Sequence, residues 1–549
     1  MRRRMLGAAR WSILALLVIA LATPAAGVPG GSSTPESRLL NHVSQSVALQ
    51  HWLANPGQAP APLRARFRAA KEAAAEANAT SAASAEDVFN NDVFGLPQNE
   101  ESVSLCKADP SLLIGGTNDY RGLLDPDGNF TGWHLSVDNG ASLAKEGLLP
   151  PVEIGGAVAR PSGGDPVDAI SDEDCDIYAS SLNYDPFEPF GNTNGIGIYK
   201  TDRDTLLSPA CGNEGPADAD CWPTRRYAAF SSNPTHFFDK EWFDVGDTGD
   251  GEHVWVTYSD FDLAPVPPNP AGFTAEIFAV RCDAELTECT DPIPISEDDV
   301  DVQFSDVTIG PDGRTYVTWS QIFGELEGTA QTFVHKIRVA EPGSTTFGKE
   351  RTIFRETLAI PFGGFLHAND FRVATYPHNE VRMVGGKPRI FVVWDACAAR
   401  PLDFVCEEPV IKISRSDTGG AAWTRPIVIS AGGDNYFANI SNDAAGASLA
   451  VVWFTSRFDE AFHNRQDVEL VTVNPGTLAV TNRQRVTATS NETEADPLLG
   501  GFFIGDYIEV AAHAGAAYTH YNANARFVRL VGQGVPIPQQ DNYLTKTPL

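Results

Sequence analysis

Short apolar strands alternate with polar turns along most of the chain. From Asp87 onward, runs of aromatic and β-branched residues are separated by Gly, Asp, Asn and Pro, which is the pattern of strands joined by turns. One unit recurs seven times, an apolar strand that often ends in Trp or Tyr before a polar turn: residues 112–120, 176–184, 253–261, 314–322, 389–397, 448–456 and 515–523. Each copy is followed by a second strand, beginning at Gly132, Gly195, Glu276, Phe333, Val410, Val468 and Arg526.

The spacing of these units predicts a closed ring of blades. Copies lie about sixty to eighty residues apart, which suits four-stranded antiparallel blades with variable loops. A single blade cannot bury both faces, and radial stacking leaves only short edges. We therefore predict an all-β fold, a β-propeller over residues 86–535, with seven blades favoured and six as the alternative. We expect Val88 to Leu96 to supply the outer strand of the last blade, the alternative being an irregular lead-in over 86–98. Residues 536–549 are interpreted as a tail.

The N-terminus has the pattern of a secretory signal. Three arginines at 2–4 precede a mostly apolar run at 11–23 and small residues at 25–27, so residues 1–27 are predicted to be a signal peptide. The run is too short to span a bilayer, and we expect a secreted protein, extracellular or periplasmic, free of the membrane after cleavage. Residues 28–85 are predicted to be a helical leader or pro-segment, because Leu40, Val43 and Val47 recur at helical spacing.

Charge and cysteine content narrow the class further. The net charge of −31 at pH 7 would repel a phosphate backbone, which excludes nucleic acid as a partner. We expect a monomer. The eight cysteines are even in number; six form close pairs, which leaves the remaining two: Cys211 with Cys221, Cys282 with Cys289, Cys397 with Cys406, and Cys106 with Cys175. In an oxidising compartment such spacing predicts structural disulfides.

Two turns carry a family resemblance. In residues 136–143, four residues stand at the spacing of an Asp box: Ser136, Asp138, Gly140 and Ser142. A second box is suggested by Ser416, Gly420 and Trp423, with Asp417 one place early and Thr418 in the usual Asp position. The chain thus resembles the sialidase-like (BNR/Asp-box repeat) β-propellers of bacterial secreted proteins over roughly residues 98–530. In that family the box lies at the blade periphery, so the resemblance implies a fold rather than an activity, and six blades are usual.

A series of polar residues begins the first strand of each predicted blade. Six of the seven are acidic and one is an amide: Glu101, Asp165, Glu241, Asp306, Asp370, Asn439 and Asp506. Repeat geometry would place them around one end of the central channel. Two carboxylates there could serve as acid and base, or nucleophile, in glycoside cleavage, and several could hold Ca²⁺. The alternative is that each is a strand-start residue that satisfies backbone donors.

The resemblance also implies sialidase features that this sequence lacks. Sialidases bind the substrate carboxylate with three arginines, the first from an Arg-Ile-Pro or Arg-Leu-Pro motif, and use a Tyr–Glu nucleophile with an Asp acid. Residues 99–102 read Asn-Glu-Glu-Ser instead. Arg372 is the one arginine close behind the ring, and Arg121, Arg281 and Arg338 mark no triad. We therefore do not expect true exo-sialidase activity.

Several further residues have both a functional and a structural interpretation. Tyr507 is comparable with the family's nucleophilic tyrosine, or it packs between blades. His367 is either an added ligand or a surface residue. The repeated tryptophans would stack on sugar rings or fill the inter-blade core: Trp242, Trp255, Trp319, Trp394 and Trp453.

Together these features predict a secreted sialidase-like propeller that binds or hydrolyses extracellular glycans at the channel mouth. The catalytic candidates are Asp165, Glu241, Asp306, Asp370, Asp506 and Tyr507. The alternative is a non-catalytic scaffold for protein or cell-wall partners. Two carboxylates within about 5–10 Å of each other across an open pocket would favour the hydrolase.

Overall fold

The structure is a computed structural model. It describes residues 43–60, 63–68, 80–81, 88–92 and 94–549, except for residues 155–157, 213–216, 265–272, 297–300, 324–330, 359–363, 367–368, 370, 398–404, 407, 444–445, 447 and 530–535. The predicted signal peptide, residues 1–27, and most of the predicted leader, 28–85, lie outside the described residues.

Seven blades form the fold, which confirms the predicted seven-bladed propeller. Blade 1 contains β2 (Gln98–Leu105), β3 (Leu113–Asp119), β4 (Thr131–Ser136) and β5 (Lys145–Leu148). Blade 2 contains β8 (Val167–Ile170), β9 (Ile177–Asn183), β10 (Asn194–Thr201) and β11 (Thr224–Ser231). Blade 3 contains β12 (His236–Asp247), β13 (Glu252–Asp262), β14 (Thr274–Asp283) and β15 (Ile293–Pro294). Within each blade the neighbouring strands are antiparallel.

The next three blades repeat this order. Blade 4 contains β16 (Val302–Ile309), β17 (Thr315–Phe323), β18 (Gln331–Ala340) and β19 (Arg351–Leu358). Blade 5 contains β22 (His378–Val384), β23 (Lys387–Ala396), β25 (Val410–Ser416) and β26 (Ile427–Val428). Blade 6 contains β27 (Asn435–Asn442), β28 (Leu449–Thr455), β29 (Arg465–Val473) and β30 (Val480–Arg485), and β31 (Asn491–Glu492) also pairs with β29.

The last blade corrects the predicted boundary at residue 535. It contains β32 (Glu509–His513), β33 (Ala516–Arg529) and β34 (Ile537–Pro548). The run at Arg526, predicted to be a separate strand, continues β33 past a bulge, and the predicted tail pairs with β33 as β34. The polar residues of 537–548 concealed this strand, because they show no apolar run, although 539–544 are all buried in the structure.

Buried strands within the blades explain why the ring forms. The predicted recurrent strands are the second strands of the seven blades, and those of blades 1, 2 and 6 are buried throughout. The second strands of blades 3 to 6 carry the fully buried indoles of Trp255, Trp319, Trp394 and Trp453. A fully buried aromatic side chain contributes about 2–3 kcal/mol by removal from water, so these tryptophans belong to the inter-blade core.

The remaining elements decorate the blades. A hairpin of β6 (Val152–Ile154) and β7 (Val158–Arg160) follows blade 1, and β20 (Gly364–Leu366), β21 (Arg372–Val373) and β24 (Val405–Cys406) form a small sheet near blade 5. Short helices are α4 (Arg203–Leu207), η1 (Tyr120–Leu124) and η2 (Thr493–Ala495). β1 (Thr80–Ser81) pairs with the end of β33.

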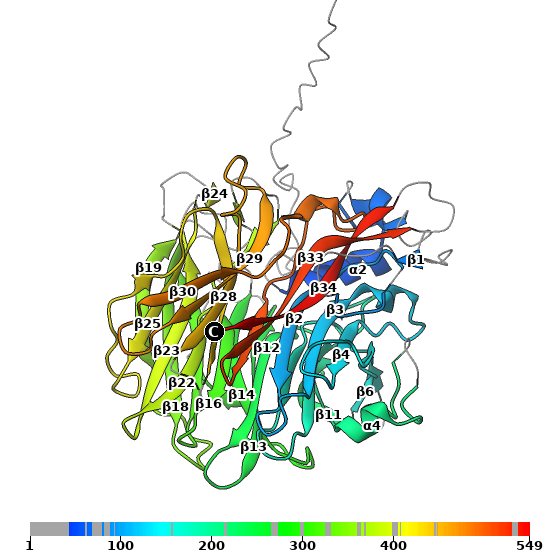
Figure 1. Cartoon of the computed structure of the whole chain (residues 1–549). Coiled ribbons are helices and arrows are strands. Elements are labelled where there is room, and N and C mark those ends of the chain that lie inside the picture. Colours follow the sequence, from blue (N-terminus) through cyan, green and yellow to red (C-terminus); the bar gives the residue numbers. More distant parts are fainter. Residues whose placement is uncertain are drawn as a thin grey trace, which may run out of the picture. The chain divides into compact units, whose positions relative to one another are not determined.

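The ring closes where the last blade meets the first. β2 contacts β32, β33 and β34, and the blue β2 lies beside the red strands in Figure 1. Val88 forms an isolated antiparallel bridge with Tyr543, and the N–H of Phe89 donates to the Asn542 carbonyl. The lead-in therefore occupies the predicted outer position on the last blade, but as one bridge rather than a strand.

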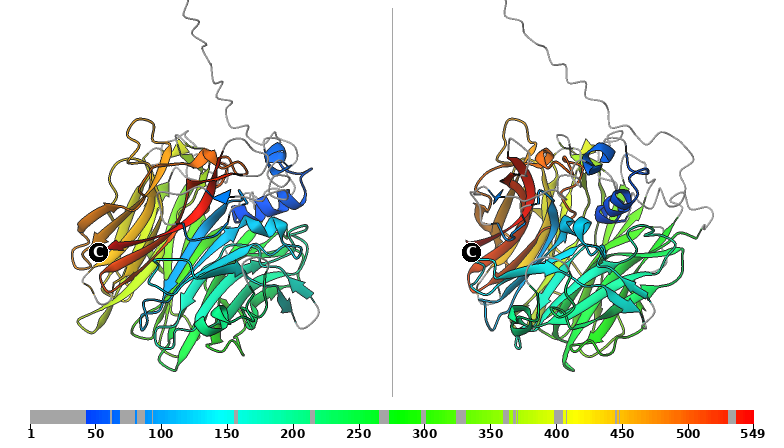
Figure 2. Two further views of the ribbon diagram at one scale, coloured as in Figure 1. Left: turned by 45° about the vertical axis from the view of Figure 1, so that its right-hand side comes forward. Right: turned by 90° about the vertical axis from the view of Figure 1, so that its right-hand side faces the viewer.

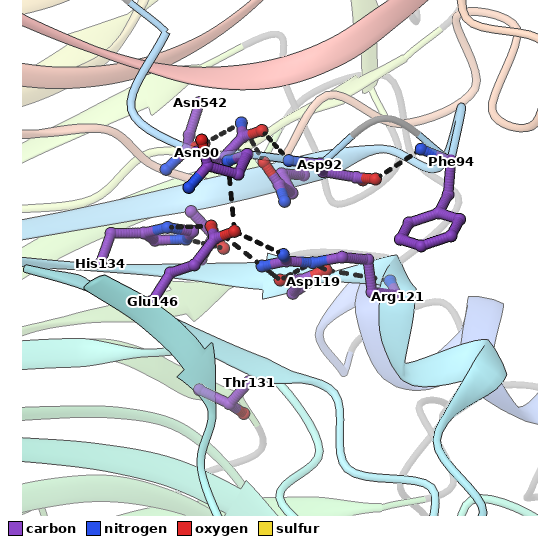
Figure 3. Close-up of polar contacts among 12 residues, drawn as sticks. Asn90, Asp92, Phe94, Asp119, Arg121, Thr131, His134, Glu146 and Asn542 are labelled. Atoms are coloured by element: carbon purple, nitrogen blue, oxygen red, sulfur yellow. Dashed lines mark hydrogen bonds and ion pairs between the residues drawn. The ribbon is translucent and has the colours of Figure 1, made fainter. Parts of the chain in front are cut away.

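Buried polar side chains line this closure seam (Figure 3). The amide of Asn90 donates to Gln98 of β2 at 2.6 Å and also to Asn542 of β34. Arg121 lies between Asp119 and Glu146, donating Nη1 to Glu146 Oε1 at 2.8 Å. This guanidinium and His134 lower the pKa of Glu146 despite its burial. Asn90 thus joins the first and last blades through side-chain hydrogen bonds, and the paired charges of Arg121 and Glu146 lie within blade 1 beside it.

An N-terminal segment, defined as residues 43–60 and 63–68, lies at one end of the sheets. It contains α2 (Gln45–Ala54) and a helical turn at 63–68, seen as the dark blue helices in both views of Figure 2. Leu49, Leu53, Leu63 and Phe67 pack into one cluster with residues of the first blade and of the connection between blades 6 and 7.

Disulfides reinforce three of the blades. Cys106 is joined to Cys175, Cys211 to Cys221 and Cys282 to Cys289, as predicted. Cys397 is also disulfide-bonded, and the side chain of Cys406 lies outside the described residues. No helix in the described part of the chain has the length and apolar character to cross a membrane.

Candidate functional site

Six charged side chains gather at the end of the channel where the innermost strands begin. This mouth cluster is made up of Glu100, Asp165, Asp239, Lys240, Arg372 and Asp506, each at most 7% exposed. Bulges in β2 and β12 put Glu100 and Lys240 in the left-handed region, with φ of 59° and 55°. Such positions are costly for residues other than glycine, so the surrounding structure must hold them there.

Two cations neutralise one carboxylate at the centre of the cluster. Arg372 Nε donates to Asp506 Oδ1 at 3.0 Å, and its Nη2 donates to Oδ2. Lys240 Nζ lies 3.7 Å from Asp506 Oδ2 and 3.8 Å from Asp239 Oδ2. Burial raises the pKa of Asp506, but the two cations outweigh burial and hold it below the ordinary value. Asp506 is therefore ionised.

The other acids of the cluster are shifted the opposite way. Glu100 accepts a hydrogen bond from the amide of Asn118 and another from the N–H of Asp506 at 3.2 Å. Burial, together with the charges of Asp165 and Asp506, raises its pKa well above the ordinary value. Burial also raises the pKa of Asp239 to about 7. The cluster therefore combines an ionised acid with acids that retain protons near neutral pH.

The N-terminal segment covers this cluster directly. Asp165 Oδ1 accepts hydrogen bonds from the hydroxyls of Ser44 and Ser46, at 2.8 and 2.7 Å. The N–H of Ser44 donates to Asp239 Oδ2 at 2.6 Å, and Arg372 Nη1 donates to the Val43 carbonyl at 2.9 Å. Two carboxylates and a guanidinium thus bind one short stretch of chain.

The predicted ring is divided between two places in the channel. Asp165 and Asp506 belong to the mouth cluster, and Glu241 and Tyr507 lie next to it. Asp306 and Asn439 lie farther down the channel. Asp370 and His367 lie outside the described residues.

Glu101 and Glu241 make no hydrogen bond to the mouth cluster. The carboxylate of Glu101 accepts from Asn522 of β33 at 3.1 Å, between blades 7 and 1. Among the described residues, neither oxygen of Glu241 has a hydrogen-bond partner, and its pKa is raised by burial and by Asp165. The bulge explains the offset, because the extra residue turns Glu100 and Asp239 inward instead.

Tyr507 is held in the wall of the channel. Its hydroxyl donates to the Pro166 carbonyl at 2.7 Å, and its ring packs against Trp242 with centroids 5.5 Å apart. Burial raises its pKa well above the ordinary value, which disfavours the phenolate that a nucleophile requires.

Farther along the innermost strands from the mouth lies a cavity of about 550 Å³, called here the lower channel, lined by residues of all seven innermost strands. Its side chains bond to the backbone of the next blade. Glu509 accepts from the N–H of Val103 and Glu380 from that of Asn442, at 2.7 and 2.9 Å. Equivalent bonds join four more junctions: Ser104 to Ile170, Asp244 to Ile309, Asp306 to Asn379, and Asn439 to Val510.

These bonds support the strand-start interpretation for Asp306 and Asn439. Innermost strands diverge from their neighbours, so their N–H groups need side-chain acceptors. Within the described residues no three His, Cys, Asp or Glu side chains are grouped so that they could hold a metal ion.

The remaining arginines take structural positions. Arg121 lies in the closure seam, and Arg281 pairs with Asp250 at 2.6 Å. Arg338 Nη1 donates to the Pro294 carbonyl. Arg372 is thus the single arginine of the mouth cluster, and the described residues form no arginine triad there.

Both predicted Asp-box turns have the expected hydrogen bonds. Ser142 N–H donates to Asp138 Oδ1 at 2.9 Å, and Gly140 N–H donates to Ser136 Oγ at 3.0 Å. In the second turn, Thr418 Oγ1 takes the place of the aspartate and accepts from Ala422 N–H at 2.8 Å. Gly420 N–H donates to Ser416 Oγ and the Trp423 indole donates to the Gly420 carbonyl. Asp417 pairs instead with Arg389 and Arg415.

Sequence reasoning missed Glu100, Asp239 and Lys240 as site residues. The available signal was the adjacency of charges, Glu100 beside Glu101 and Asp239-Lys240-Glu241. Aligning one residue per blade selected the wrong neighbour, because a bulge shifts the inward position by one or two residues.

No family model matches the chain, and no curated protein sequence matches it. Structures of similar arrangement include a Hadza microbial sialidase, 10% identical with a TM-score of 0.42 over 76% of this chain and 73% of that one. A GH93 α-L-arabinofuranosidase of Fusarium graminearum is 11% identical, with a TM-score of 0.41 over 72% and 99%. A puromycin-hydrolysing peptidase of Mycobacterium tuberculosis is 12% identical, with a TM-score of 0.41 over 85% and 56%. The likenesses are remote, and each activity belongs to the protein named.

Proposed function

We propose that the mouth cluster is the active site of a secreted, glycan-processing propeller. The observation that carries the proposal is the pair of carboxyls on either side of Ser44: Asp239 accepts its N–H, and Asp165 accepts its hydroxyl. Two carboxyl groups separated by one small group are what glycoside cleavage requires. Disulfides support secretion, because they persist in oxidising compartments.

The two carboxyls suit different roles. With its pKa near 7, Asp239 retains a proton at neutral pH and would donate it to the leaving oxygen of a glycosidic bond. Asp165, whose oxygen already accepts two hydroxyl groups, would bind sugar hydroxyls and act as base or nucleophile. Lys240, Arg372 and Asp506 would position these groups, since they touch one another and the covering segment.

The mouth selects against acidic sugars. Four carboxyls face two cations in the cluster, and the single guanidinium is already bound to Asp506. Neutral glycans are therefore the proposed substrate class, because Arg372 and Lys240 already contact Asp506 and neither cation of the cluster is left to bind a sugar carboxylate.

The test is hydrolysis of fluorogenic neutral glycosides by the full chain. We expect Asp239→Asn to lower turnover about 10²–10⁴-fold, the range for a lost general acid. Asp306→Asn is the matched control, since it changes an equally buried acid in the lower channel and should leave turnover within a few-fold. The same glycosides are tested on Ser44→Ala/Ser46→Ala, because the N-terminal segment covers the mouth and this variant removes its hydroxyl bonds to Asp165.

A non-catalytic glycan-binding scaffold is the second candidate. It is favoured by the burial of the mouth cluster, whose six side chains are each at most 7% exposed. Glycan binding that depends on Asp165, without turnover by the wild type or by Ser44→Ala/Ser46→Ala, would identify the scaffold. Neither binding nor turnover in either protein would refute both functions.

A further inference from the structure

The N-terminal segment contacts the mouth through one peptide group and two hydroxyls. The Val43 carbonyl and the Ser44 N–H belong to the same amide, and Arg372 binds the oxygen while Asp239 binds the N–H. The hydroxyls of Ser44 and Ser46 lie beside that amide and donate to Asp165. The cluster is therefore arranged to bind a secondary amide with neighbouring hydroxyl groups.

We infer that Val43–Ser46 is a built-in, displaceable occupant of the mouth, bound where a neutral N-acylated sugar binds. This inference rests on the proposed function. An acylamino sugar carries the same groups on a single ring: an amide N–H, an amide carbonyl and adjacent hydroxyls. The segment supplies each of them from its own chain, so ligand and segment compete for the same three side chains.

Burial shows why the occupant must move before a ligand can bind. Asp239 and Glu100 are fully inaccessible, and Asp165 is 4% exposed. A sugar cannot reach Asp239 while Ser44 is in place. The apparent affinity of the mouth is then its intrinsic affinity multiplied by the fraction of molecules in which the segment has opened.

The segment is attached by contacts that can be weakened separately. Val43 and Val47 pack into the cluster of blades 2 and 3, and the amide of Gln50 donates to the Gly163 carbonyl. Removing the two serine hydroxyls takes away the two bonds to Asp165, the bond between the hydroxyls, and the cap bond from the Ser46 N–H to Ser44 Oγ at the start of α2. Hydrogen bonds to a buried acceptor and a helix cap are together strong enough that their loss should raise the opening constant about tenfold to a hundredfold.

The experiment combines hydrogen exchange with ligand titration on the full chain. Exchange of residues 43–54 is followed in the wild type and in Ser44→Ala/Ser46→Ala. Gln58→Ala is the matched control, because it removes only an exposed contact with His51 on the same segment. We expect at least tenfold faster exchange of 43–54 in the double variant, with unchanged exchange in the innermost strands.

N,N′-Diacetylchitobiose, called chitobiose below, and cellobiose form the matched ligand pair. They differ in having an acylamino group or a hydroxyl group at the same ring position. We expect chitobiose to bind the double variant at least tenfold more tightly than the wild type and to speed exchange of residues 43–50. Cellobiose should bind more weakly than chitobiose to both proteins. The blocked peptide acetyl-Val-Ser-Gln-Ser-amide is a third probe, and tighter binding of it than of chitobiose would overturn the sugar assignment.

The remaining outcomes separate this inference from the proposed function. Exchange of 43–54 as slow as that of the blade strands in both proteins would overturn the displaceable occupant, whatever the sugars do. Equal chitobiose affinity with unchanged protection of 43–50 would also overturn it, while leaving the proposed function in place. Opening of the segment without binding of any sugar would overturn the proposed function and the sugar assignment, while confirming that the occupant is displaceable.

Discussion

The mouth and the lower channel are both lined by acidic residues, yet these residues bind different kinds of partner. In the lower channel, carboxyls such as Glu380 and Glu509 accept a backbone N–H from the next blade. At the mouth, Asp506 is bound by Arg372 and Lys240, and Asp165 and Asp239 bind the N-terminal segment. The same residue type at a similar repeat position can therefore join blades in one place and form a site in another.

The largest effect is expected from breaking the charge pair at the mouth. Arg372→Met should lower the free energy of unfolding by about 3–5 kcal/mol, because it leaves Asp506 buried without its main partner. Urea denaturation measures the loss. Lys107→Met is the control, since the Lys107–Asp172 pair is about half exposed and should cost less than about 1 kcal/mol. Equal losses would contradict the special role of the mouth pair.

A smaller effect is expected from pH in the lower channel. Burial raises the pKa of Asp168 to about 7, so the folded protein keeps a proton that the unfolded chain releases above about pH 4. This group therefore makes the free energy of unfolding fall as pH rises through 7. Asp168→Asn should remove about 2 kcal/mol of the decrease between pH 5 and pH 8, measured by urea denaturation at both values.

The contribution of Asp506 to the pH dependence of the free energy of unfolding should have the opposite sign. Its pKa is lowered in the folded protein, so its contribution to stability is present above pH 4 and is lost as pH falls further. A decrease between pH 5 and pH 8 that is unchanged in Asp168→Asn would contradict the assignment of the lower-channel acid.

Removing a single hydrogen-bond acceptor in the lower channel should lower the free energy of unfolding by less than the pH effect of Asp168. Glu380→Ala leaves the N–H of Asn442 without its side-chain acceptor and should lower the free energy of unfolding by about 1–2 kcal/mol. Glu380→Gln retains an acceptor oxygen and is expected to lose less than half as much. Thermal or urea unfolding of the two variants compares them, and equal losses would show that charge rather than acceptance matters there.

The smallest effect should come from the turns at the blade periphery. Asp138→Ala removes three hydrogen bonds from an exposed turn and should cost about 1 kcal/mol. Thr418→Ala should cost about half as much, because a hydroxyl replaces the carboxylate in that turn. Glycan turnover should stay the same in both, which would place the turns outside the site.

The sequence predicted the architecture better than the site. Period and strand pattern located all seven second strands, because each begins with or contains an apolar run before a polar turn, and β3 and β28 are buried throughout. The polar β34 was predicted to be a tail, since its residues give no such signal. The bulges in β2 and β12 depend on φ values at Glu100 and Lys240, and single-residue patterns do not record them.

The covering of the mouth was even less accessible to sequence reasoning. Ser44 and Asp239 are 195 residues apart, and neither lies in a recognisable motif. Helical spacing indicated a helix near Val43 and Val47, but its position over the channel depends on the closed ring. Long-range polar contacts of this kind follow from the fold and not from local pattern.

The contacts of the N-terminal segment with the mouth cluster have a consequence for the order in which the protein folds during synthesis. Residues 43–46 leave the ribosome before any blade does, yet their partners Asp165, Asp239 and Arg372 come from three widely spaced parts of the chain. Asp506, which orients Arg372, is made only after six blades are complete. The nascent protein therefore carries an unpaired mouth until its final blade is made, and the leading residues can settle only on a finished ring.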